Sequence, residues 1–116
     1  MRYALLIYSD ESQAASATPE QMGQVMAAYN AFTAELQNSG AMLGGEAFEP
    51  TMKANTVQVT NGNTKVSDGA AVSSDLQLGG YYVVKADSHD EALKWAAKIP
   101  GAAMGKIEVR PLMEFE

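Results

Sequence analysis

The chain has 116 residues, 47% of them hydrophobic, with no cysteine and a formal net charge of −6. This length is typical of a single domain, here residues 1–116, and it allows a core without disulfides. The lack of cysteine excludes a thiolate metal site and a thiol nucleophile. The 8 Lys and Arg residues are scattered singly, which disfavours direct binding to nucleic acid or to an anionic membrane.

The apolar run at residues 3–8 is the first predicted element. It is far shorter than the roughly 20 residues of a membrane span, and it lacks the cleavage site of a signal peptide. We therefore expect a soluble, cytoplasmic protein. Because both alternating sets of side chains in the run are apolar, it predicts a strand that is covered on two sides. The small and polar residues 9–17 after it predict a loop.

Thr18, Pro19 and Gln21 form a strong start signal for a long helix. Thr18 can accept a hydrogen bond from the third helical N–H, Pro19 suits the first helical position, and Gln21 can reach back to the cap. Ser39 and Gly40 end the helix. Its apolar stripe contains Met22, Val25, Met26, Tyr29, Phe32 and Leu36. A wall lining a ligand is one interpretation of this stripe, and core packing is the interpretation that we favour.

Two glycine pairs, Gly44-Gly45 and Gly79-Gly80, interrupt predicted strands. Neither pair has the spacing of a phosphate-binding loop, and neither precedes a helix. They predict a bulge or a close approach of two backbones, in the strand at residues 41–48 and at the start of the strand that follows the second pair.

A β-hairpin is predicted between these two strands. Residues 56–60 alternate between polar and apolar, Asn61-Gly62 is a turn signal, and residues 64–67 return. Since the hairpin is more polar than the first strand, we expect it at an edge of the sheet.

The stretch of residues 66–84 is the plausible functional site. It opens with Asp68-Gly69, continues with small and polar residues that cannot form a core, and runs into a strand at residues 80–86. A loop held between two strands is a common place for function on a rigid scaffold.

Ser88 and Glu91 predict a second capping box, and Pro100-Gly101 ends the helix that it starts. The single histidine, His89, excludes any site that needs two, and as a first-turn residue it is expected to be exposed. We expect no metal site and no cofactor. The buried stripe is expected to contain Ala92, Leu93, Ala96 and Ile99, with Trp95 off the stripe.

Residues 106–115 predict the last strand, with Pro111 at an edge or a bulge. The order strand–helix–strand, hairpin, strand–helix–strand predicts an α+β fold: a ferredoxin-like sandwich with an inserted hairpin and two helices on one face of an antiparallel sheet. The other face would be bare, although residues 3–8 and 81–84 are apolar on both sides. We therefore expect a homodimer in which two sheets stack face to face.

Asp68 is the acidic residue that merits a functional hypothesis. It could act as a general acid or base in a partly dry site, or it could accept backbone hydrogen bonds and fix the turn, which we favour. Tyr81 and Tyr82 point to opposite faces, so one of them could line a ligand-binding cleft beside Asp68 and Gly69. Arg110 is a candidate partner for an anionic ligand.

With these residues in view, the chain resembles the YCII-related family, and within it the DGPF-type branch. The resemblance covers nearly the whole length and depends on the order and spacing of short segments. These are RYALLIY at residues 2–8, YNAF at 29–32, Asp68-Gly69, QLGGYY at 77–82, DEALKWA at 90–96 and IEVRPL at 107–112.

The resemblance implies a dimeric α+β barrel built from two ferredoxin-like halves, which agrees with the bare sheet face. In the family, an aspartate and a histidine beside a cleft have suggested an enzyme of unknown reaction. Some members are also linked to transcription initiation and to alternative sigma factors.

The chain departs from the branch signature Asp-Gly-Pro-Phe, because Asp68-Gly69 is followed by Ala70-Ala71. Ser73-Ser74 and residues 101–105 stand where an acidic residue and a histidine are often found. Of the site that the resemblance implies, only Asp68 is therefore present.

Three roles are compatible with these residues, one of which is purely structural. The one that we favour is a non-catalytic dimeric module that binds a small ligand or a protein partner, with a regulatory role open. The alternative is an enzyme that uses Asp68 as acid or base on a small polar substrate, with Tyr81 or Tyr82 and Arg110 orienting it.

Overall fold

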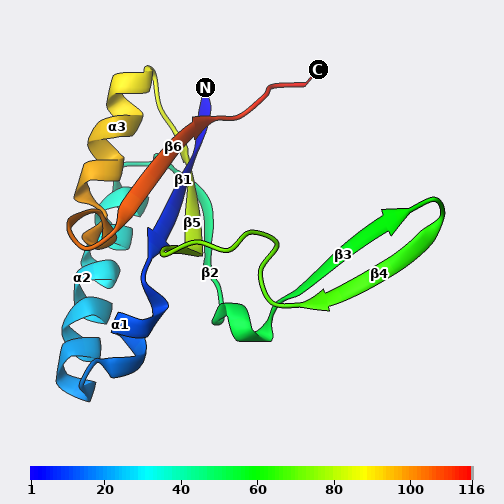
Figure 1. Ribbon diagram of the computed structural model, residues 1–116. Coiled ribbons are helices and arrows are strands. Elements are labelled where there is room, and N and C mark those ends of the chain that lie inside the picture. Colours follow the sequence, from blue (N-terminus) through cyan, green and yellow to red (C-terminus); the bar gives the residue numbers. More distant parts are fainter. Residues whose placement is uncertain (116) are drawn as a thin grey trace.

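The computed structural model describes residues 1–115 and contains a four-stranded antiparallel sheet in the order β2-β5-β1-β6 (Figure 1). The strands are β1 (Arg2–Ser9), β2 (Met42–Ala47), β5 (Gln77–Lys85) and β6 (Lys106–Pro111). This order, with the long helices on one face, confirms the predicted ferredoxin-like α+β fold. The sheet is open, and no barrel closes within residues 1–115. None of the helices in this range is long and apolar enough to cross a membrane.

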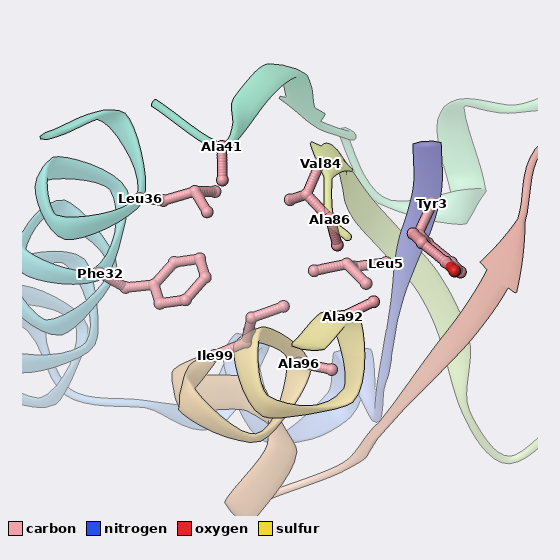
Figure 2. Close-up of a cluster of buried hydrophobic side chains, with 10 residues drawn as sticks. All are labelled: Tyr3, Leu5, Phe32, Leu36, Ala41, Val84, Ala86, Ala92, Ala96 and Ile99. Atoms are coloured by element: carbon pink, nitrogen blue, oxygen red, sulfur yellow. The ribbon is translucent and has the colours of Figure 1, made fainter. Parts of the chain in front are cut away.

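The core lies between the sheet and the helices α2 (Pro19–Asn38) and α3 (His89–Lys98) (Figure 2). Tyr3 and Leu5 of β1 and Val84 of β5 point toward the helices and are almost completely buried. The remaining buried side chains come from the helices and the segments beside them: Phe32, Leu36, Ala41, Ala86, Ala92, Ala96 and Ile99. Residues far apart in the chain thus share one apolar layer, whose burial is the main favourable term in folding.

Helix α2 begins with the predicted capping box. Thr18 Oγ1 accepts from the Gln21 N–H at 3.1 Å, and Gln21 Oε1 accepts from the Thr18 N–H at 2.9 Å. Only the second half of its apolar stripe is buried, so the prediction of core packing is wrong for the first half, which consists of Met22, Val25 and Met26. The reason is that α2 extends beyond the end of the sheet (Figure 1), where no strand can cover it.

Helix α3 begins with Ser88, whose hydroxyl accepts from the Glu91 N–H at 3.1 Å. The Glu91 carboxylate reaches the N–H of the residue before Ser88, at 2.8 Å, rather than that of Ser88 itself. Leu93 is 45% exposed, so its predicted burial is wrong; Ala92 and Ala96 face the sheet instead. Trp95 is half-buried, with its ring 6.2 Å from that of Phe32.

Residues 9–17 are not a simple loop as predicted, because they contain the short helix α1 (Glu11–Ser16). Its sequence has no apolar stripe, so periodicity could not reveal it. Asp10 caps it by accepting from the Ser12 N–H and hydroxyl, and the hydrogen bond from the Ser12 side chain is the main cause that lowers the Asp10 pKa. The Glu11 carboxylate accepts from the N–H and the hydroxyl of Thr51, both at 2.8 Å, which ties α1 to the 3-10 turn η1 (Thr51–Lys53).

Strands β3 (Asn55–Thr60) and β4 (Asn63–Asp68) form the predicted hairpin. Asn61 and Gly62 have φ values of 52° and 80°, the conformation of a two-residue type I′ turn. The predicted position is wrong, however. The hairpin is a separate two-stranded sheet that projects from the body (Figure 1), because the edges of the main sheet are formed by β2 and β6.

The last strand ends at Pro111, short of the predicted residue 115. Tyr3 pairs with Pro111, and the Leu112 N–H donates to the Arg2 carbonyl at 2.9 Å. Beyond this point β1 has no residues left to pair with. Phe115 is consequently exposed instead of being an apolar strand residue.

Both glycine pairs lie at irregular strand pairing, as predicted. The register shifts between Met42 and Gly44, and again where β5 passes Ile7 and Tyr8. At Gly80 an added Cβ would lie 2.7 Å from the backbone carbonyl oxygen of Glu46 in β2. This confirms the close approach of two backbones at that position.

We expect Gly80→Ala to lower the free energy of unfolding by about 1–3 kcal/mol, because the new methyl group must push β2 away from β5. Gly44→Ala is the matched control on the neighbouring strand, since nothing lies within 4 Å of its added Cβ. Urea unfolding of both variants measures the difference. Equal stabilities would show that β2 and β5 separate at this point without cost.

Candidate ligand-binding face of the sheet

The helices leave one face of the sheet uncovered. In β1 the core residues Tyr3 and Leu5 alternate with Ala4, Leu6 and Tyr8, which therefore point to the opposite face. The strand pairing adds residues of β5 directly beside them. We call this surface the open face, and its apolar residues on the two central strands are Ala4, Leu6, Tyr8, Leu78, Tyr81 and Val83.

Phe48, just after β2, extends the apolar part of the open face. Its ring lies 5.8 Å from that of Tyr81, and its N–H donates to the Gly79 carbonyl at 2.8 Å, which continues the strand pairing. Phe48 is exposed and Tyr81 is half-buried. An aromatic pair therefore stands on the open face, outside the buried core.

Charged residues border this apolar surface along β6. Pairing with β1 places Lys106 opposite Tyr8, Glu108 opposite Leu6 and Arg110 opposite Ala4. All three thus belong to the open face. Glu108 and Arg110 form an ion pair, whereas the ion pairs found within residues 1–115 do not include Lys106.

A shallow hollow of about 460 Å³ lies at this border. It is lined by Tyr8 of β1, by Ser74 and Leu76 of the loop at residues 69–76, and by Lys106, Ile107 and Glu108 of β6. The hollow therefore combines a phenol, a serine hydroxyl, one ammonium group and the Glu108 carboxylate with an aliphatic wall.

The loop that supplies Ser74 and Leu76 is held in place by Gln77. Its side-chain N–H donates to the Ser74 carbonyl at 2.7 Å, and its side-chain oxygen accepts from the Glu11 N–H at 2.9 Å. The Leu76 N–H also donates to the Ser74 hydroxyl at 3.2 Å. These bonds connect the loop to the start of α1, so the wall of the hollow has a defined position.

The two predicted tyrosines lie on opposite faces of the sheet. Tyr82 points to the helices, where its hydroxyl lies 2.7 Å from that of Thr33 and its ring lies 5.2 Å from that of Phe32. Tyr81 lies on the open face, as does Arg110. A ligand-binding role for each of them stays a prediction.

Asp68 and Gly69 lie at the base of the hairpin. The Asp68 carboxylate is exposed and accepts from the side-chain N–H of Asn55 at 3.0 Å. Gly69, with φ of 96°, donates its N–H to the Ala54 carbonyl at 2.8 Å and accepts from the Thr56 hydroxyl at 2.9 Å. Neither residue lines the hollow. These bonds close the hairpin where it joins the body.

Sequence reasoning did not identify Tyr8, Ser74, Leu76, Lys106 or Glu108 as site residues. One signal was available: the charges at 106, 108 and 110 alternate with the apolar Ile107 and Val109. In a strand, this alternation places the three charges on one face. The contribution of the loop could not be found in this way, because loop residues have no periodicity.

Comparison with known proteins gives two further findings. The chain matches the YCII-related domain over residues 1–116. It is also 34% identical over 118 residues to the uncharacterised protein R00369 of Rhizobium meliloti (strain 1021), and the match covers 100% of this chain and 95% of that protein.

We expect Gly69→Ala to make the hairpin amides exchange about tenfold faster, because a side chain at a φ of 96° strains the closure of the hairpin. Asp68→Ala removes one exposed hydrogen bond and should have a smaller effect. Hydrogen exchange followed by NMR over residues 55–68 measures both variants. A larger effect of Asp68→Ala would show that the carboxylate, rather than the backbone, holds the hairpin.

Proposed function

The chain belongs to the YCII-related family, and from this starting point we propose that it is a homodimeric module that binds a small organic anion. The single observation that carries the proposal is the open face, an apolar surface bordered by a hollow with an available cation. In this proposal the protein binds its ligand on the open face of the sheet and catalyses no reaction.

The homodimer is supported by the residues of the open face. Leu6, Tyr81 and Val83 lie at the centre of the sheet, on the side that the helices do not cover. An apolar surface of this kind is typical of an interaction site. Two such sheets can stack face to face about 10 Å apart, with their side chains interdigitated. The second copy would also cover the hollow.

The chemistry of the hollow favours a small carboxylate with an apolar body. Glu108 is partly neutralised by Arg110, so the ammonium group of Lys106 is the lining cation that we assign to the ligand. Tyr8 and Ser74 offer hydroxyl groups to a carboxylate, and Leu76 offers an apolar contact. Partial burial under a second copy would strengthen the charge interaction, because the local dielectric falls.

The position of Asp68 supports binding over the alternative of an enzyme. Its carboxylate accepts a hydrogen bond from Asn55 at the hairpin base, whereas the hollow is lined by other residues. The single histidine, His89, is exposed at the start of α3, with its ring 5.5 Å from that of the core residue Tyr3. A proton transfer by Asp68 would therefore need a substrate placed away from the hollow.

Two narrower assignments stay predictions. Asp68-Gly69 agrees with the DGPF-type branch, and Ala70-Ala71 departs from it. The expectations of a cytoplasmic location and of no nucleic-acid partner rest on the sequence alone.

We expect organic carboxylates to raise the melting temperature of the wild-type protein in a thermal-shift screen. At about 100 times its dissociation constant, a ligand adds about 2.7 kcal/mol of stability. Lys106→Gln should remove this shift, and Lys94→Gln on the exposed side of α3 should keep it. A shift that survives Lys106→Gln would place the ligand elsewhere, and a screen without hits would favour a protein partner.

We expect Leu6→Glu to convert the dimer into a monomer, because it places a charge at the centre of the stacked sheets. Leu93→Glu is the matched control, since Leu93 is already 45% exposed on α3. Sedimentation velocity gives the mass of each species, and circular dichroism checks that both variants are folded. A Leu6→Glu dimer would contradict stacking through the open face.

A further inference from the structure

The hairpin β3–β4 has an apolar face that nothing in residues 1–115 covers. Val57 pairs directly with Val66, and Val59 lies two residues along the same strand, so all three side chains share one face. Thr64, opposite Val59, and the pair of Asn55 and Asp68 at the base complete this face. The exposed fractions are 61%, 61% and 65% for Val57, Val66 and Val59. We call these three residues the valine face.

The opposite face of the hairpin is polar. It carries Thr56, Gln58, Thr60, Asn63, Lys65 and Ser67. This alternation is typical of a strand pair with one side in water and the other side packed on protein. A two-stranded hairpin by itself is marginally stable in water at best, and it becomes stable when its apolar face packs on another layer. The hairpin thus has the pattern of a packed strand pair, but residues 1–115 supply no layer for its valine face to pack on.

The hairpin extends on the side of the sheet where a second copy would lie. In Figure 1, α2 and α3 are on one side of the sheet and the hairpin projects on the other. Each of its strands is about 20 Å long, and stacked sheets lie about 10 Å apart. The hairpin is therefore long enough to pass alongside the sheet of a copy that is stacked on the open face.

The area of the open face also favours a second copy as the occupant. Four strands spaced by about 4.8 Å and about 20 Å long give a face of about 400 Å², whereas a stable dimer buries about 800 Å² on each partner. The valine face adds about 200 Å² to the buried area of each subunit. The surface on which the hairpin of the other subunit docks adds about another 200 Å². The hairpin thus brings the interface to the size of a stable dimer.

We propose that the hairpin is an exchanged arm, whose valine face docks on a second copy of the chain. This inference rests on the proposed stacking of two open faces. In the dimer, each subunit extends one arm and receives one, as expected for a two-fold interface.

The test combines Val57→Thr, Val59→Thr and Val66→Thr in one variant, which keeps the β-branched shape and removes the apolar surface. The control combines Gln58→Thr and Lys65→Thr on the polar face. We expect the dimer dissociation constant, measured by sedimentation equilibrium, to rise at least about tenfold in the first variant, because burial of three valines is lost, and to stay near the wild-type value in the control. An unchanged constant in the first variant would overturn the exchanged arm.

A second measurement uses only the wild-type chain, so it does not depend on the folding of a variant. Hydrogen exchange of residues 55–68 is followed while the protein concentration is raised through the dimer dissociation constant. Exchange that slows as dimer forms supports the arm, and exchange that is the same in monomer and dimer overturns it. If Leu6→Glu abolishes the dimer while the valine variant keeps the wild-type dissociation constant, the exchanged arm is contradicted and the stacking of the two sheets is not. A wild-type chain that is monomeric at all concentrations overturns both.

Discussion

The structure depends on one constraint: its central strands are apolar on both faces, and its two long helices can cover only one. Tyr3, Leu5 and Val84 meet the helices and form the core, while Leu6 and Tyr81 lie on the open face. Hydrophobic burial is not directional, so the same side chains that stabilise the core on one side favour association on the other. The fold of one chain therefore leaves part of its apolar surface uncovered.

The hairpin also has an apolar face that no other part of residues 1–115 covers. Its backbone groups pair between β3 and β4, and its base is closed by bonds from Gly69 and Thr56. Backbone pairing alone, however, leaves the valine face in water. The open face and the hairpin both lie on the side of the sheet away from the helices (Figure 1). In the proposed dimer one second copy would cover the open face and the valine face, which are too large for a small ligand.

The hollow gathers its polar groups from three distant parts of the chain. Tyr8 lies near the end of the first strand, Ser74 belongs to the loop before β5, and Lys106 starts the last strand. Since Glu108 is engaged with Arg110, the charge that remains for a ligand is that of Lys106. This arrangement can hold and orient an anion. The Asp68 carboxylate has a separate position, at the junction of hairpin and body.

The sequence by itself determined the elements, because their signals are local. The capping residues Thr18 and Ser88, the Asn61-Gly62 turn and the period-two alternation act within a few residues, and each element formed close to its predicted place. The sequence also determined that both faces of β1 are apolar, from which the bare face followed. Helix α1 was not predicted, because its sequence has no periodic apolar residues.

Only the tertiary structure decided which of these residues meet. Whether Met22 and Leu93 are buried depends on where the sheet ends and on how a helix is rotated against it, and neither property is local. The position of the hairpin outside the main sheet, and the meeting of Tyr8, Ser74 and Lys106 at one hollow, depend on strand order and register. Strand order and register are set by the packing of segments that are distant in the chain, so no short stretch of sequence carries them.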